Sequence, residues 1–251
     1  MRRHSIPGGL RKNPFPPELG NLLLWLDTTD PTTVFADNPP TIQAVNNDPI
    51  EYIVNRGTDG SSLDMVTWPN SPNFAILKTN VINGRQILGL DDEITDNSIL
   101  SVGAGAGPTD NPNGATIAAV MRKQVLNNNL HGPSPASFND FIITATTTWT
   151  AECCDSGSED TGKAQVAGEW VWVYITATSA GDATFRASGV GESSSAGNPF
   201  SDFGLTRNIA YFLNQGQIAE CLYWDLALGT TAKADLITYF DDKYGVLPFI
   251  T

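Results

Sequence analysis

The sequence is poor in residues that crosslink a chain or bind soft metals, with three cysteines and two histidines among 251 residues. An odd number of cysteines cannot form a disulfide framework without leaving one over, which indicates a reducing compartment. Cys221 lies in an apolar run and is interpreted as a small buried hydrophobe. Cys153 and Cys154 are adjacent, and free thiols in a turn are the simplest interpretation. A strained disulfide or a share in a metal site are the alternatives.

Long apolar runs are also absent. No run approaches the roughly 20 residues that a membrane-spanning helix needs, so we expect no contact with a membrane. The opening residues, MRRHSIPGGLRKNPFPPEL, carry the charges of a secretion signal but have proline and polar residues in place of its apolar segment. We therefore expect a chain that is made and folded in a cytoplasm and is not secreted.

Basic residues are scarce, since 14 lysines and arginines oppose 27 aspartates and glutamates for a net charge of −13. A mostly acidic surface lacks the clustered cations that neutralise phosphates, so nucleic acid is not an expected partner. The charge is uneven, because residues 1–20 carry a net +3 and the remaining 231 carry −16. We interpret residues 1–20 as an extended basic arm rich in proline and glycine, and residues 21–251 as one acidic domain.

The sequence also lacks the signatures of common enzymes. It contains no G-x-S-x-G turn for a serine nucleophile. The segment GSEDTGKA at 157–164 has the glycine and lysine spacing of a phosphate-binding loop, but it places two carboxylates where the phosphates would lie and an alanine where the loop needs a hydroxyl group. Carboxylates cluster at 90–96 and 155–160, without the spacing of a dedicated calcium loop. We expect no catalytic residue and no cofactor. The alternative is a bound Ca²⁺ ion, with Asp91, Asp92, Asp155 and Asp160 as candidate ligands.

The sequence is instead rich in short apolar runs bounded by Gly, Pro, Asn or Asp. This spacing predicts an all-β sandwich or barrel. The predicted strands cover residues 22–27, 50–54, 74–78, 85–90, 115–123, 141–150, 169–178, 184–190, 208–213 and 217–225.

One short amphipathic helix is predicted near the C-terminus, after the last long strand. We expect it to act as a lid over an edge or an end of a sheet. The residues that indicate it are Thr230 or Thr231 as the N-terminal cap, Leu236, Phe240 and Tyr244 on one apolar face, and Gly245 at the C-terminal end.

The strand EWVWVYIT allows two interpretations, because alternation puts Trp170, Trp172 and Tyr174 on one face and aliphatic residues on the other. In the first, it is a central strand with one face in the core and the other covered by a second layer or a neighbouring subunit. In the second, the aromatic row is a platform on which sugar rings stack, together with Trp68 or Trp149.

Three segments together resemble concanavalin A-like lectin and glucanase domains, of the laminin-G-like kind found in bacteriophage structural proteins. They are LLLWLDTTDPTTVF, NVINGRQILGLDDE and AECLYWDLALGTTAKADLITYFDDKYGV. The resemblance implies a jelly roll of two antiparallel sheets with a closing strand and helix. The E-x-D-x-x-E motif of the family's glucanases has no match here, and the metal-binding loops of its lectins have no clear counterpart, so the resemblance implies no activity by itself.

The resemblance and the arm together suggest a non-enzymatic virion structural protein: a capsid decoration, a head fibre or a tail component. Its partners would be other virion proteins, such as the capsid or tail shell, in a symmetric array or homo-oligomer. The residues expected to anchor it are Arg2, Arg3, Arg11, Lys12 and Phe15. A carbohydrate-binding module for host surface glycans is the alternative, and a glycoside hydrolase is a third hypothesis.

Overall fold

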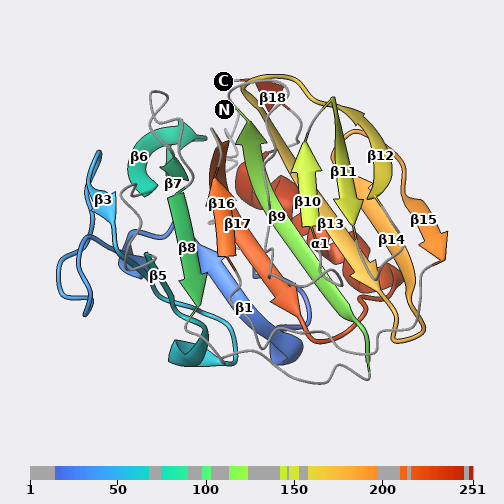
Figure 1. Cartoon of the computed structure of the whole chain (residues 1–251), viewed down its shortest axis with the longest axis horizontal. Helices are drawn as coiled ribbons and strands as arrows, with labels where there is room; N and C mark the ends of the chain where they lie inside the picture. The colour runs from blue at the N-terminus through green and yellow to red at the C-terminus, as the bar shows by residue number, and fades with distance from the viewer. Residues whose placement is uncertain are drawn as a thin grey trace, which may run out of the picture.

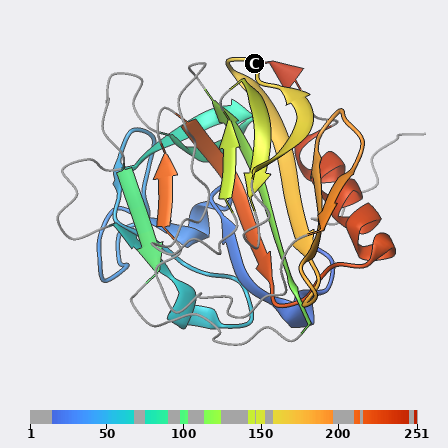
Figure 2. The ribbon, with the colours of Figure 1, turned by 45° about the vertical axis from the view of Figure 1, so that its right-hand side comes forward.

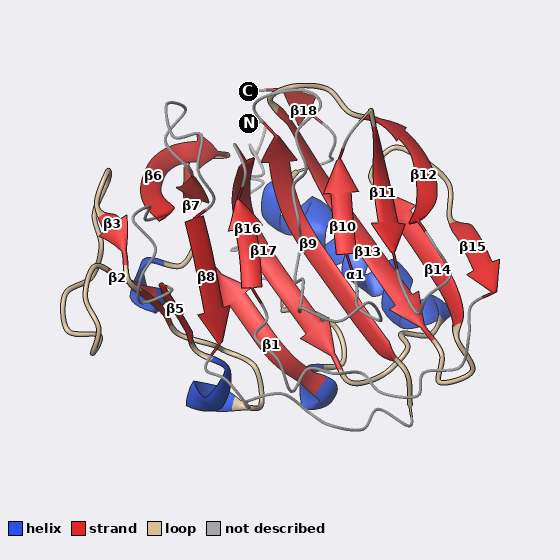
Figure 3. Ribbon diagram, viewed as in Figure 1, coloured by secondary structure: helices blue, strands red, loops and turns tan. Residues whose placement is uncertain are grey.

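The computed structural model describes residues 15–67, 75–89, 98–102, 113–123, 142–145, 147–152, 158–196, 210–213, 216–245 and 249–250. These residues form two layers of antiparallel strands, with one α-helix on the outer face of the larger layer (Figures 1 and 3). This confirms the predicted all-β architecture with a C-terminal helix. Within these ranges no helix is both long and apolar enough to cross a membrane.

The larger layer is a ten-stranded sheet in the described part of the chain. Its middle strands, β9, β13 and β17, are three of the predicted apolar runs, and every residue of β13 is buried. In spatial order the sheet contains β15 (Ser193–Ala196), β14 (Asp182–Ala187), β13 (Glu169–Ala177), β9 (Ala115–Lys123), β17 (Gly216–Trp224), β7 (Arg85–Gly89), β6 (Ala75–Ile82) and β3 (Pro49–Ile50). In addition, β1 (Leu22–Asp27) pairs with β17, and β18 (Phe249–Ile250) pairs with β13.

The second layer consists of two smaller sheets in front of the large one (Figure 1). One contains β16 (Ala210–Leu213), β8 (Ser98–Val102), β5 (Met65–Thr67), β4 (Tyr52–Ile53) and β2 (Val34–Phe35), in that order. The other contains β10 (Ile142–Ala145), β11 (Thr148–Glu152) and β12 (Ser158–Ala164). The inner core lies between the layers and joins Ile117 and Ile175 of the large sheet to Met65 and Trp149 of the smaller ones.

Two predicted strands are each divided in the structure. The run at 50–54 belongs to both layers, because β3 pairs with β6 of the large sheet and β4 with β5 of the second layer. The run at 141–150 is not one strand: β10 and β11 pair with each other in antiparallel register. A β-branched stretch favours strand conformation throughout and so does not reveal where the chain reverses.

The helix α1 (Thr230–Tyr244) packs across the outer face of the large sheet, as Figure 2 shows from the side. Leu236, Phe240 and Tyr244 are fully buried there, which confirms the predicted apolar face. The helix thus covers the face of the sheet, and the prediction that it covers an edge or an end is wrong. It needs this position because β1, β9, β13 and β17 carry large apolar side chains on both faces.

The ends of α1 match the prediction in part. Gly245 has a φ of 82° and ends the helix, as expected from a residue that adopts left-handed conformations freely. The N-terminal cap is Gly229, not a threonine, and no side chain caps the first turn. Thr230 is instead the first helical residue.

Candidate functional site

A β-bulge in β17 turns Glu220 toward the helix. Ile218 pairs with Met121 and Glu220 with Val120, so Ala219 is an extra residue in the register. Before the bulge the side chain of Ile218 enters the inner core, whereas after it Leu222 and Glu220 face α1. If this sequence formed a regular strand with no bulge, Glu220 would lie on the same face as Ile218 and point into the inner core, because successive side chains alternate along a strand.

Glu220 is fully buried and accepts hydrogen bonds from four side chains. Its Oε1 accepts from Trp25 Nε1 at 2.6 Å, from Lys243 Nζ at 3.0 Å and from the Tyr239 hydroxyl, and its Oε2 accepts from the Tyr244 hydroxyl at 2.8 Å. Burial raises the pKa of Glu220, and the charge of Lys243 opposes this rise. The four donors replace the water that the carboxylate gives up on burial.

Asp27 lies directly opposite Glu220 in the register between β1 and β17. Lys243 Nζ is 2.8 Å from Asp27 Oδ2, so one ammonium group serves both carboxylates. The other oxygen of Asp27 accepts from the backbone and hydroxyl groups of Thr29, at 3.1 and 2.6 Å. Two like charges directly across a strand pair repel each other, and the lysine compensates for that repulsion.

The segment from Asn55 to Gly57 runs beside β1 and positions Arg56. Arg56 donates its backbone N–H to the carbonyl of Trp25 at 3.0 Å, and its guanidinium lies 4.3 Å from the centre of the Trp25 ring. Gly57 permits this approach, since a Cβ there would be 2.1 Å from the carbonyl oxygen of Leu23. The guanidinium also donates to Asp30 Oδ2 at 2.8 Å.

Asp30 starts the short 3₁₀ helix Pro31–Thr33, and its Oδ1 accepts from the backbone N–H of Thr32 at 2.9 Å. Partial burial would raise the pKa of Asp30, but the hydrogen bonds from Thr32 and the charge of Arg56 outweigh burial and lower it. This carboxylate is therefore held in its ionised form by groups of the protein itself.

The turn between β6 and β7 positions Arg85. Asn83 and Gly84 have φ angles of 48° and 76°, which is typical of a two-residue hairpin turn with Asn-Gly. The Asn83 side chain donates to the carbonyl oxygen of Tyr244, so the turn is tied to the end of α1. Arg85 follows the turn and is half-buried. No described residue forms a hydrogen bond or an ion pair with its guanidinium.

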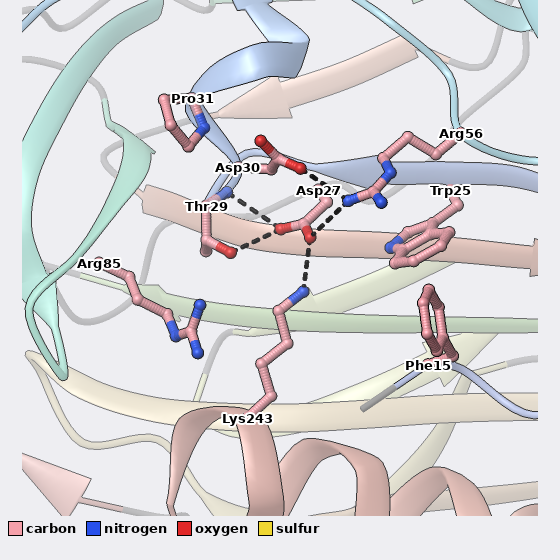
Figure 4. Close-up of a pocket in the computed structure, with 9 residues that line it drawn as sticks. All are labelled: Phe15, Trp25, Asp27, Thr29, Asp30, Pro31, Arg56, Arg85 and Lys243. Carbon is pink, nitrogen blue, oxygen red and sulfur yellow. Dashed lines mark hydrogen bonds and ion pairs between the residues drawn. The ribbon is translucent and has the colours of Figure 1, made fainter. Parts of the chain in front are cut away.

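These residues surround a pocket of about 250 Å³ at the C-terminal end of α1 (Figure 4). Phe15 is 60% exposed and packs edge-on against Trp25, with ring centres 6.2 Å apart. In Figure 4 Phe15 and Arg85 lie on opposite sides of the Lys243 side chain. The lining residues are Phe15, Trp25, Asp27, Thr29, Asp30, Pro31, Arg56, Arg85 and Lys243.

Of the predicted site residues that the structure describes, only Phe15 lines this pocket. Trp170, Trp172 and Tyr174 are buried beneath α1, and Trp149 is buried in the inner core. Their rings therefore present no open face to a sugar. Of the two interpretations of this strand, the structure has the one in which a second layer covers the aromatic row.

The remaining predicted site residues cannot be placed in the pocket or outside it. Asp160 belongs to β12, and nothing is described of its side chain. In the part of the chain that is described, no group of three or more His, Cys, Asp or Glu residues could hold a metal ion, and Cys221 is buried in the inner core, as predicted. Outside the described residues lie Arg2, Arg3, Arg11, Lys12, Trp68, Asp91, Asp92, Cys153, Cys154 and Asp155.

Sequence reasoning missed the other pocket residues as a site, although a signal for them was present. Each of the three segments behind the family resemblance contributes to this corner of the molecule. The first supplies Trp25 and Asp27, the second Arg85, and the third Lys243.

The sequence matches no protein-family model and no curated protein. The structure is similar to the receptor-binding domain of botulinum neurotoxin D, with a TM-score of 0.59 and 10% identity over 89% of this chain and 53% of that one. It is also similar to the binding domain of Paraclostridial Mosquitocidal Protein 1, with a TM-score of 0.58 and 12% identity over 90% of this chain and 55% of that one.

A third similar structure is an arabinofuranosidase complexed with arabinofuranosyl-alpha-1,2-xylobiose, with a TM-score of 0.55 and 10% identity over 96% of this chain and 61% of that one. The chain therefore spans between half and about three fifths of the length of these proteins. At such low identity the likeness shows the fold alone, a lectin-like β-sandwich.

Proposed function

We propose that this chain is a non-enzymatic carbohydrate-binding domain and that the pocket at the end of α1 is its binding site. The observation that carries the proposal is the presence, in one small pocket, of an exposed aromatic ring, Phe15, and a hydrogen-bond donor, Arg85, whose guanidinium has no partner among the described residues. A sugar ring has an apolar face that packs on an aromatic ring and hydroxyl oxygens at its rim that accept hydrogen bonds.

The size of the pocket and the functions of similarly folded proteins support the same proposal. Its volume of about 250 Å³ is close to the lower end of the range for small-molecule sites, roughly 300 Å³, and suits one or two sugar rings. The similar structures include receptor-binding domains and a protein in complex with an arabinofuranosyl xylobiose. This kind of sandwich thus occurs in proteins that bind receptors and sugars.

The carboxylates of the site favour binding over hydrolysis. A glycosidase needs one carboxyl group that gives a proton to the scissile bond and another that faces the sugar or a water. Here Asp27 is held by Lys243 and Thr29, and Asp30 by Arg56 and Thr32. Glu220 is buried behind them and has no exposed surface. We therefore expect no release of reducing ends from polysaccharides that the chain binds.

A glycan array tests the proposal, with Phe15→Ala as the binding-site variant. The matched control is Ile42→Ala, since Ile42 is as exposed, at 61%, and does not line the pocket. We expect the wild type and the control to bind the same glycans, and the Phe15 variant to lose most of its signal. A chain that binds no glycan, or a Phe15 variant that binds as well as the wild type, would contradict the proposal.

The second candidate function is a virion structural protein, as a capsid decoration, a head fibre or a tail component. The observation that favours it is the fixed point at which residues 15–17 join the sandwich: Pro16 is buried, and Trp224 Nε1 donates to the carbonyl of Pro17 at 3.0 Å. A basic segment that precedes such a fixed point is suited to lie on an acidic surface of a capsid or tail shell. A carbohydrate-binding domain on a virion would combine both functions.

Deletion of residues 1–14 tests the second candidate, because it removes the basic residues and keeps Phe15, Pro16 and Pro17. We expect the shortened protein to unfold at the same temperature as the full chain and to be missing from purified particles. The control restores the length but not the charge, with glutamine at positions 2, 3, 11 and 12. Full incorporation of the shortened protein would rule out the arm as the anchor.

A further inference from the structure

The charges that line the pocket indicate a narrower class of ligand than carbohydrates in general. We infer that it binds an acidic sugar, with the ring on Phe15 and the carboxylate on the guanidinium of Arg85. This inference rests on the proposed carbohydrate-binding function and names the chemistry that the same pocket selects. It rests on the charges that line the pocket, on the rigid placement of Arg85 and on the surroundings of that residue.

The charged groups around the pocket are paired with one another, with one exception among the described residues. Lys243 contacts Asp27 at 2.8 Å and Glu220 at 3.0 Å, and Arg56 contacts Asp30 at 2.8 Å. Every pocket carboxylate thus has a protein donor. Arg85 has no such partner among the described residues, and none of them occupies the N–H groups that its guanidinium can offer to a ligand. The ligand must therefore bring acceptors to that side of the pocket.

Arg85 is also held in place by its surroundings. It follows directly on the Asn83-Gly84 turn, and the Asn83 side chain is bonded to the last carbonyl of α1. The backbone of Arg85 pairs with Ile82 across the hairpin. In Figure 4 its side chain extends from β7 into the pocket, toward the side where Lys243 and Asp27 lie. Because the hairpin already fixes the backbone of Arg85, little conformational entropy is lost when a ligand binds to it.

A carboxylate suits this position better than other acceptors. The planar fork of a guanidinium matches the two oxygens of a carboxylate, and the paired, charge-assisted hydrogen bonds that result are stronger than bonds to a neutral hydroxyl. A dianion such as a phosphate monoester would also meet the charges of Asp27 and Asp30, which line the same pocket. A single negative charge gains the contact with Arg85 at a smaller cost in repulsion.

The exposed ring of Phe15 supplies the other half of the recognition. The Trp25 ring packs against Phe15 and Arg56 and is only 5% exposed, so Phe15, at 60%, is the aromatic surface of the pocket that a ligand can reach. A uronic acid carries a carboxylate at one end of an otherwise ordinary sugar ring. In an oligomer of such rings, one ring can pack on Phe15 while a carboxylate is directed to Arg85, on the other side of the Lys243 side chain.

The experiment compares oligosaccharides that differ in the carboxylate alone. Oligouronides rich in glucuronate or galacturonate and their carboxyl-reduced counterparts, in which each carboxylate is a primary alcohol, are titrated into the full chain by calorimetry. We expect the acidic form to bind about 10-fold to 100-fold more tightly, which is the effect of hydrogen bonds to a charged group. We expect Arg85→Gln to bind both forms with the same weak affinity.

Lys78→Gln is the control, because Lys78 is a cation of the neighbouring strand that does not line the pocket. Thermal unfolding of Arg85→Gln should match the wild type, since no described residue depends on its guanidinium. Equal binding of acidic and reduced oligosaccharides, or acid selectivity that survives in Arg85→Gln, would overturn the inference and leave carbohydrate binding intact. Absence of binding to these and to all glycans of the array would overturn the proposed function as well.

Discussion

Asp27 and Glu220 face each other across β1 and β17, and the ammonium group of Lys243 lies 2.8 Å from the first and 3.0 Å from the second. Two carboxylates at adjacent positions of a sheet are costly to bury, so this pair depends on the lysine that α1 brings to it. The contact thus joins an early strand, a late strand and the helix at the floor of the pocket.

Replacement of Lys243 by methionine should lower the free energy of unfolding by about 3–5 kcal/mol at neutral pH, because it leaves two buried carboxylates without a cation. Burial raises the pKa of Glu220, and without the opposing charge of the lysine its value in the folded variant lies further above that of the unfolded chain. Stability that depends on such protonation is present at low pH and is lost as the pH rises. The deficit should therefore shrink as the pH falls, and urea unfolding at a series of pH values measures it.

The matched control for this change is Lys233→Met on the same helix. Lys233 pairs with Glu192 at 2.8 Å near the surface, and such pairs contribute at most about 1 kcal/mol. Adding Glu220→Gln to Lys243→Met should restore part of the loss, since only one buried carboxylate then remains. Equal effects of the two lysine substitutions would show that the buried contact has no special role.

Phe240→Ala should destabilise the protein by about 3–5 kcal/mol, which is the usual cost of removing a large aromatic ring from a core. The ring is fully buried between α1 and the large sheet and stacks on Trp172, with ring centres 6.3 Å apart. Asp235→Ala, on the exposed side of the same helix, should change stability by less than about 0.5 kcal/mol. Thermal or urea unfolding of both variants distinguishes these outcomes, and a small loss for Phe240→Ala would contradict the packing described for α1.

Gly57→Ala should cost about 1–3 kcal/mol, because the new methyl group would meet the carbonyl oxygen of Leu23 at 2.1 Å and the backbone must move. Since Arg56 precedes this glycine, the move should also weaken its contact with Trp25, which tryptophan fluorescence can report. Gly191→Ala is the control, as nothing lies within 4 Å of its added methyl group. A Gly57 variant that is as stable as the Gly191 variant would contradict the close approach.

Asp30→Asn should lower stability by up to about 1 kcal/mol near neutral pH, a typical value for a surface ion pair. The pKa of Asp30 is lowered from 3.8, so its contribution is present above that value and is lost as the pH falls through the lower folded value. The two proteins should therefore become equally stable in acid. Urea unfolding at several pH values measures the difference.

Asp59→Asn provides a control in which the expected change in stability at neutral pH has the opposite sign. Burial, together with the charge of Asp225, raises the pKa of Asp59 above 3.8. The charged form of Asp59 is therefore unfavourable in the folded state, and its removal should increase stability at neutral pH and change little in acid. The same sign for both variants would contradict these pKa directions.

Local patterns made much of the fold predictable. The run LLLWLD, the Asn-Gly turn before Arg85 and the apolar face of Leu236, Phe240 and Tyr244 each depend on neighbours within a few residues. Such signals are carried by hydrogen bonding and side-chain spacing that the sequence displays directly.

The site was not predictable in the same way, because it depends on contacts between distant segments. The single extra residue at Ala219 reverses which face Glu220 occupies, and no composition or period marks it. The row of Trp170, Trp172 and Tyr174 looked equally suited to a sugar or to a covering layer until the position of α1 was known. The alternation of residues in a sequence shows that the two faces of a strand differ, but only the packing of the folded chain shows which element covers each face.

Trp172→Ala is consequently a poor test of glycan recognition. Its ring is buried under Phe240, so truncation would leave a cavity beneath α1. Any loss of binding in that variant would mix unfolding with recognition. Phe15 and Arg85 are better positions, since both lie at the pocket and neither is fully buried.

The pairing of β1 with β17 determines how late in translation the sandwich can close. Asp27 and Lys243 are 216 residues apart, and Trp25 and Glu220 are 195 apart. At roughly 5–20 residues per second, about 10–40 s pass on the ribosome between the emergence of the first strand and that of its partner. During this time the apolar face of β1 has no sheet to join, and exposed apolar surface of this kind is prone to aggregation.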